Sequence, residues 1–133
     1  MFDTFQEKKF KEPDQRYTVD GDILITHVKL PKHFFPDSTI IKHLQISQSN
    51  IQELHDDCLL PLKPHLESFS LVSGRLKEIP QKAFKGLNKL IALDLEANAI
   101  VDLPSYSFYG LHLIKLNMKG NQIQKVSDKV NTK

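Results

Sequence analysis

The sequence predicts a fold of stacked repeats, because this chain of 133 residues aligns with itself several times. Three segments match without a gap over twenty-two positions, starting at Ile41, Leu66 and Leu90, and a fourth copy from Leu113 stops after its first half. Apolar residues recur at positions 1, 4, 6, 11 and 14 of the copies. The alternation at positions 4 and 6 is typical of a short strand with one buried face.

Length differences between the copies fall in a single joint. The starting residues are 25, 24 and 23 positions apart, and the whole difference lies in the connector after position 22. These connectors are Lys63-Pro64-His65, Asn88-Lys89 and His112. An insertion elsewhere would shift every buried side chain of that repeat, so its restriction to one joint supports stacking.

Two further positions have structural roles. Asn98 and Asn121 occupy position 9, where an amide can donate to and accept from the backbone of neighbouring repeats. Phe84 and Phe108 occupy position 19, in a second half that packs an apolar row behind the sheet. Because position 9 is serine and then glycine in the first two copies, we expect the N-terminal repeats to be less regular.

The pattern resembles the leucine-rich repeat family, in the form LxxLxLxxNxIxxLPxxxFxxL that is typical of its extracellular members. Segments 41–62, 66–87, 90–111 and 113–126 carry this resemblance. It implies an α/β leucine-rich-repeat solenoid, with a curved parallel sheet on the concave side and irregular or short helical segments on the convex side.

The elements before the first full repeat differ in character. Residues 1–15 are charged and lack an apolar signal core, and we expect a flexible N-terminal segment there. Residues 16–40 are expected to form an N-terminal cap: an alternating stretch with a turn at Asp20-Gly21 or Gly21-Asp22 predicts a hairpin. Leu30-Pro31 followed by Phe35 then copies the second half of a repeat, so the cap merges into a partial coil.

The repeats extend over 41–126 and leave a tail at 127–133. Segment 113–118 is expected to be an exposed edge strand, which can pair with another chain. Two interpretations stay open: the chain is a fragment of a longer receptor-like protein, or it forms homo-oligomers through this edge.

Composition excludes several classes of partner. Eighteen basic and sixteen acidic side chains leave a formal charge of +2, too small to indicate binding to nucleic acid or to an anionic membrane. No apolar run has the length of a membrane span. We also expect no cofactor, since no glycine-rich phosphate loop or nucleophile motif occurs.

The segment His55-Asp56-Asp57-Cys58 has the residue types of a metal or catalytic site. Alignment places Cys58, the only cysteine, at a position where the other repeats have Ala83 and Ser107. Four adjacent ligands rarely converge on one ion, because zinc sites usually separate their ligands by spacers. We therefore predict a structural packing role for Cys58, with no metal site and no catalytic residues.

The register places polar side chains along the outer face of the sheet. We expect this concave face to bind a protein ligand, as the resemblance implies, through five candidate residues: His43, Asp94, Glu96, Asn117 and Lys119. The same register makes Glu96 and Lys119 cross-strand neighbours that could form an ion pair. A plain solvated surface is the competing interpretation, and Tyr106 and Tyr109 form a second candidate patch on the convex side.

The sequence thus predicts a binding module and not an enzyme. It favours a protein-binding repeat segment of an extracellular or receptor-like protein, although there are no cap cysteines and no glycosylation sequon. The alternatives are a structural element that assembles through its open C-terminal edge, or an intracellular scaffold or regulatory repeat protein.

Overall fold

The computed structural model describes residues 16–20, 28–37 and 39–129. The flexible segment predicted for residues 1–15 lies outside the described residues, as do residues 21–27, which hold the predicted hairpin turn, and the end of the tail.

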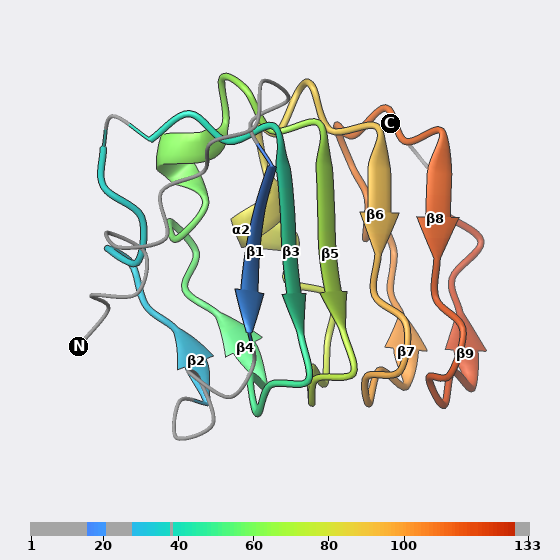
Figure 1. Ribbon diagram of the computed structural model, residues 1–133. Helices are drawn as coiled ribbons and strands as arrows, with labels where there is room; N and C mark the ends of the chain where they lie inside the picture. The colour runs from blue at the N-terminus through green and yellow to red at the C-terminus, as the bar shows by residue number, and fades with distance from the viewer. Residues whose placement is uncertain (1–15, 21–27, 38, 130–133) are drawn as a thin grey trace.

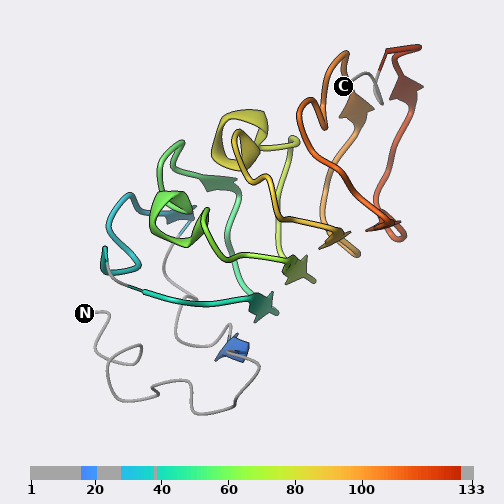
Figure 2. The same cartoon turned by 90° about the horizontal axis from the view of Figure 1, so that it is seen from above.

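The predicted solenoid is confirmed: a sheet of five parallel strands lines one side of the molecule (Figure 1). Seen end-on in Figure 2, the strands follow an arc, and the helical segments lie on its outer, convex side. The strand order is β1 (Arg16–Asp20), β3 (His43–Ser47), β5 (Ser68–Val72), β6 (Ala92–Asp94) and β8 (Lys115–Asn117). We call the repeats that start at residues 41, 66, 90 and 113 coils 1 to 4.

The strand β1 adds one more coil before coil 1. It pairs in parallel with β3, with Arg16 opposite His43 and Thr18 opposite Gln45. Tyr17 is buried, as are the side chains at the corresponding position of coils 1 to 3. Within the described residues β1 is therefore a repeat strand, and the second arm of the predicted hairpin falls in the part of the chain that the structure does not describe.

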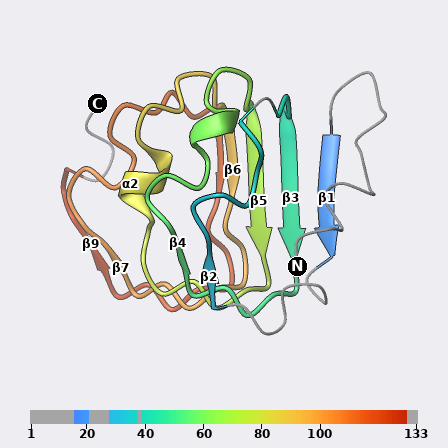
Figure 3. The same cartoon turned by 90° about the vertical axis from the view of Figure 1, so that its left-hand side faces the viewer.

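Among the described residues, the elements on the convex side are short (Figure 3). Strand β2 (Lys29–Leu30) pairs in parallel with β4 (Glu53–Leu54), and β7 (Asp102–Leu103) pairs with β9 (Lys125–Val126). A 3-10 helix η2 (Leu60–Leu62) follows β4, and a one-turn helix α2 (Gln81–Phe84) lies in coil 2.

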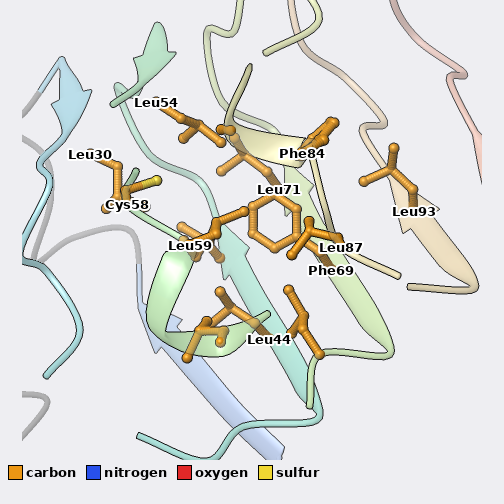
Figure 4. Close-up of a cluster of buried hydrophobic side chains, with 14 of the residues drawn as sticks. Leu30, Leu44, Leu54, Cys58, Leu59, Phe69, Leu71, Phe84, Leu87 and Leu93 are labelled. Atoms are coloured by element: carbon orange, nitrogen blue, oxygen red, sulfur yellow. The ribbon is translucent and has the colours of Figure 1, made fainter. Parts of the chain in front are cut away.

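The core fills the space between the sheet and these convex segments (Figure 4). Side chains at positions 1, 4, 6 and 11 of coils 1 to 3 are buried almost completely, as the repeat pattern predicts. Phe69 of the sheet and Phe84 of α2 meet edge to face, with ring centroids 6.0 Å apart. This packing holds the sheet at a fixed distance from the convex side.

The same sharp turn follows each of the strands β3, β5, β6 and β8. Position 8 has a positive φ in all four coils: 53° at Gln48, 57° at Ser73, 61° at Ala97 and 74° at Gly120. Only Gly120 adopts this left-handed conformation without steric cost. The turn directs the chain out of the sheet and aligns the strands in one register.

Candidate functional site

The concave surface consists of columns of side chains that run across the strands. Strand register gives one column of His43, Ser68, Ala92 and Lys115, and a second of Gln45, Ser70, Asp94 and Asn117. Neighbouring strands are about 4.8 Å apart, so each column is a continuous track. Positions between these columns are buried in coils 1 to 3, which leaves the two columns as the outer face.

Four of the five predicted binding residues form one hydrogen-bond network. The amide of Asn117 donates to Oε1 of Glu96 over 2.8 Å. The backbone N–H of Glu96 donates to Oδ1 of Asp94, and that of Lys119 donates to Oδ1 of Asn117, each over 3.0 Å. Coils 3 and 4 thus contain the same turn, in which the side chain at position 5 accepts a hydrogen bond from the backbone N–H at position 7.

The predicted pairing of Glu96 with Lys119 is wrong. Among the described residues the ion pair that is formed joins Lys29 to Glu53, while Glu96 accepts from Asn117. Asn117 has a short side chain already oriented by its bond to the Lys119 backbone. A flexible lysine loses more rotamer entropy for a weak exposed ion pair, so the amide is the preferred partner.

The fifth candidate, His43, lies apart from this network. Its Nδ1 is 2.8 Å from the hydroxyl of Ser68, its neighbour on β5. One strand, β5, separates the strand of His43 (β3) from β6, where the network begins at Asp94. The concave face therefore has two polar centres and not one.

A shallow hollow of about 260 Å³ lies on this face, over strands β5, β6 and β8. Its lining includes Ser68, Ser70 and Ala92, whose small side chains leave the space open, together with Asp94 and Asn117. The sequence analysis did not select these small residues as candidates. The sequence signal for this hollow is the small size of the side chains at three neighbouring positions of the columns.

Each of the two predicted structural asparagines bonds its own coil to the coil before it. Asn98 donates to the carbonyls of Leu71 and Leu95 and accepts from the N–H of Leu76. Asn121 makes the equivalent bonds one coil later, to the carbonyl of Leu95 and the N–H of Ile100. These bonds satisfy backbone groups that the turn would otherwise leave buried without a partner.

In coil 1 a serine replaces part of this bonding. The N–H of Ile51, which an asparagine in coil 2 would bind, donates instead to the hydroxyl of Ser49 over 3.3 Å. At Gly74 a side chain has no room, because a Cβ there would lie 2.8 Å from Oδ1 of Asn98. The sheet is not weaker in this half: β3 and β5 pair over five residues, whereas β6 and β8 pair over three. The expected irregularity is therefore not found in the strands.

The segment from His55 to Cys58 does not form a common site. Nδ1 of His55 accepts the N–H of Asp57 over 3.0 Å, whereas Cys58 is completely buried beside Leu30 and Leu59 (Figure 4). Burial raises the pKa of the Cys58 thiol from 9.0 to about 12, so the reactive thiolate is scarce at neutral pH. Leu59 is buried at the position that Phe84 and Phe108 occupy in the next two coils.

The second candidate patch is exposed on the convex side. Tyr106 and Tyr109 meet edge to face with ring centroids 6.0 Å apart, and both remain largely accessible. Tyr106 has a φ of 63°, and its N–H donates to the carbonyl of Lys129. Phe108, between them in sequence, points into the core.

No group of three or more histidine, cysteine, aspartate and glutamate side chains in residues 16–20, 28–37 and 39–129 is arranged to hold a metal ion. In the same part of the chain, no helix has the length and apolar character needed to cross a membrane.

Comparison with known proteins agrees with the repeat architecture. The family model described as leucine rich repeat matches residues 64–123. The chain is similar to keratocan of Bos taurus, with 27% identity over 130 residues, which cover 95% of this chain and 36% of keratocan. The chain therefore spans well under two thirds of the length of this relative.

Two shorter matches have higher identity. Keratocan of Gallus gallus is 36% identical over 69 residues, covering 50% of this chain and 20% of that protein. The human leucine-rich repeats and immunoglobulin-like domains protein 1 is 32% identical over 84 residues, covering 62% of this chain and 8% of that protein.

Proposed function

We propose that this chain, which matches the leucine rich repeat family model over residues 64–123, is a leucine-rich-repeat module that recognises a protein ligand through its concave face. The observation that carries the proposal is the hollow of about 260 Å³ over β5, β6 and β8, bordered by Asp94 and Asn117. A concave surface with an apolar lining and a few oriented polar groups is the usual form of a binding site.

The bonds within the network prepare its polar groups for a ligand. Glu96 and Asn117 hold each other by a hydrogen bond of 2.8 Å, so they lose little conformational entropy on binding. Lys115 and Lys119 are exposed in coil 4, next to Asp94 and Glu96 of coil 3, so positive and negative charges lie close together on this surface. Such an arrangement recognises a partner with a matching pattern of charges.

We assign a binding role and not a catalytic one. His55 and Cys58 have separate environments, and the raised pKa of the Cys58 thiol makes it a poor nucleophile. We place the protein in the extracellular or receptor-like class. The name of the human relative pairs leucine-rich repeats with immunoglobulin-like domains, an architecture common at cell surfaces.

The experiment is a binding screen of the full chain against an array of secreted proteins and cell-surface ectodomains, followed by concave-face variants. Ala92→Trp fills the hollow and Asp94→Lys reverses a charge; each is expected to weaken binding at least tenfold. Lys85→Glu on the convex side is the control, because Lys85 is exposed and outside the site. Unchanged affinity in both concave variants would refute the concave face as the site.

A second candidate function is assembly through the open C-terminal edge. Leu116 and Val126 of coil 4 are 42% and 59% exposed, although both belong to positions that are buried or partly buried in coil 3. Four exposed lysines of the same coil would repel a second copy: Lys115, Lys119, Lys125 and Lys129. Self-association at this edge should therefore increase with salt, which sedimentation at low and high ionic strength can measure.

A further inference from the structure

The backbone pairing on the convex side is interrupted at coil 2. The N–H at position 15 bonds to the preceding coil in two places, His55 to the carbonyl of Leu30 and Ser127 to that of Leu103, both over 2.9 Å. Coils 2 and 3 have Pro80 and Pro104 at this position, and proline has no N–H. The two convex strand pairs, β2 with β4 and β7 with β9, are those in which position 15 of the second coil is not proline.

This interruption leaves one edge of β4 without a strand partner. The N–H groups of Glu53 and His55 donate toward β2, to the carbonyls of Val28 and Leu30. Alternate residues of a parallel strand direct their backbone groups to opposite sides, so the N–H and C=O of Leu54 point toward coil 2. Leu54 is only 5% exposed, which makes these backbone groups costly to leave without a partner.

A hollow of about 450 Å³ lies where a paired strand would be. It opens beyond the bond from the N–H of Lys77 to the carbonyl of Gln52, 3.4 Å long. The inner lining includes Leu54, Leu76, Ile79 and Pro80, and polar side chains surround it. The hollow thus combines an unpaired strand edge with an apolar floor.

The charges around the hollow favour a basic occupant. Along coil 1, which an added strand would follow, the charged lining residues are Glu53 and Asp56, both acidic. Coil 2 contributes Glu78 between Lys77 and Lys82. Lys29 lies 3.7 Å from Glu53, but both side chains are so exposed that the pair is weak. The acidic wall therefore remains able to attract a cation.

We propose that the hollow between coils 1 and 2 is a second binding site, which takes a short, extended, basic peptide segment of a partner protein. The peptide backbone would accept from the N–H of Leu54 and donate to its carbonyl, completing the edge of β4. An apolar side chain would cover Ile79 and Pro80, and a lysine or arginine would face Glu53 and Asp56. The site lies on the convex side, opposite the concave face, so the two could be occupied together.

The test uses a displayed library of random seven-residue peptides, selected on the full chain. Pro80→Ser restores the missing N–H and should let coil 2 pair with Leu54, closing the site. Serine already occupies this position in coil 4 as Ser127, and it is a favoured residue at the start of a helix such as α2. Pro104→Ser is the matched control, because it restores the same N–H one coil away from the hollow.

We expect basic peptides to be enriched on the natural chain and on Pro104→Ser, and to bind Pro80→Ser at least tenfold more weakly. Hydrogen exchange at the Leu54 amide should slow when a selected peptide is added. Three outcomes would each overturn the proposal: no enrichment, which indicates a water-filled groove only; equal binding to Pro80→Ser; or enrichment of peptides without basic residues.

Discussion

At the scale of single residues, the molecule depends on side chains that complete the backbone of a neighbouring coil. Asn98 binds four backbone groups in two coils and is almost fully buried. Asn121 makes the same kind of bonds in the last coil, where it is only partly buried. The two residues have the same repeat position but a different access to water.

We predict that Asn98→Ala lowers the free energy of unfolding by about 3 kcal/mol, because it leaves buried carbonyl and N–H groups without partners. Asn121→Ala should cost about 1 kcal/mol, since water can replace its bonds. Urea unfolding followed by circular dichroism measures both. Equal losses would show that burial does not decide the effect.

The buried thiol predicts a dependence of stability on pH. The pKa of Cys58 is raised to about 12 in the folded chain, from an ordinary value of 9.0. Below pH 9 both folded and unfolded thiols are protonated, and above it the unfolded chain loses its proton first. Stability should therefore fall as the pH rises from 9 toward 12, by about 2 kcal/mol at pH 10.5.

Urea unfolding at pH 8 and pH 10.5 measures this fall, and Cys58→Ala is the control that should show a shallower one. Tyr17 adds a fall of the same sign in both proteins, because burial raises its pKa to about 12 as well. A parallel pH dependence of the two proteins would contradict the role of Cys58.

At the scale of elements, a single repeat position decides whether convex strands pair. His55 departs from the proline pattern of coils 2 and 3, and its N–H closes the pair of β2 and β4. The sequence singled out this residue as a possible metal ligand, whereas its backbone makes the structural contribution. The ring serves locally, as the acceptor for the N–H of Asp57.

Restoring the repeat pattern at this position should therefore destabilise the protein. We predict that His55→Pro lowers the free energy of unfolding by about 2 kcal/mol, because the carbonyl of the fully buried Leu30 loses its donor. His55→Ala keeps the N–H and should cost less than about 1 kcal/mol. The comparison uses urea unfolding, and similar losses in the two variants would count against the backbone argument.

Much of the element plan could be predicted because apolar side chains at positions 4 and 6 must face one core. The strand β1 was missed as a repeat strand, since the sequence has Asp14 three positions before Tyr17, where the other copies have Ile or Leu. The spacing in the sequence also differs between the two ends of this repeat. Residue 14 lies 27 residues before Ile41, whereas Leu30 lies 24 residues before Leu54, its equivalent in coil 1. The alternation of Tyr17 and Val19 was its remaining signal.

The polar surface was less predictable than the core. The register placed polar side chains along the concave face, yet it could not choose between Asn117 and Lys119 as the partner of Glu96. The choice depends on which side chain is already ordered, and Asn117 is held by its bond to the Lys119 backbone. The convex hollow follows from the backbone N–H that Pro80 lacks. A pattern of apolar side chains carries no information about backbone N–H groups.

At the scale of the whole molecule, burial changes toward the C-terminal end. Position 4 is 1% exposed in Leu44 and Phe69, 2% in Leu93, and 42% in Leu116. Each coil of a solenoid buries its faces only against its neighbours, so the last coil keeps one face open. The contribution of the side chain at position 4 to stability thus depends on the coil in which it lies.

We predict that Leu93→Ala lowers the free energy of unfolding by about 3 kcal/mol, since it removes a buried side chain and leaves a cavity. Leu116→Ala, the same change at the same position one coil later, should cost about 1 kcal/mol or less, because the side chain is already 42% exposed. Urea unfolding measures both variants, and sedimentation at the same concentrations shows whether the chain is a monomer. Equal losses in a monomer would contradict the open end, whereas equal losses that grow with protein concentration would show that a second copy covers coil 4.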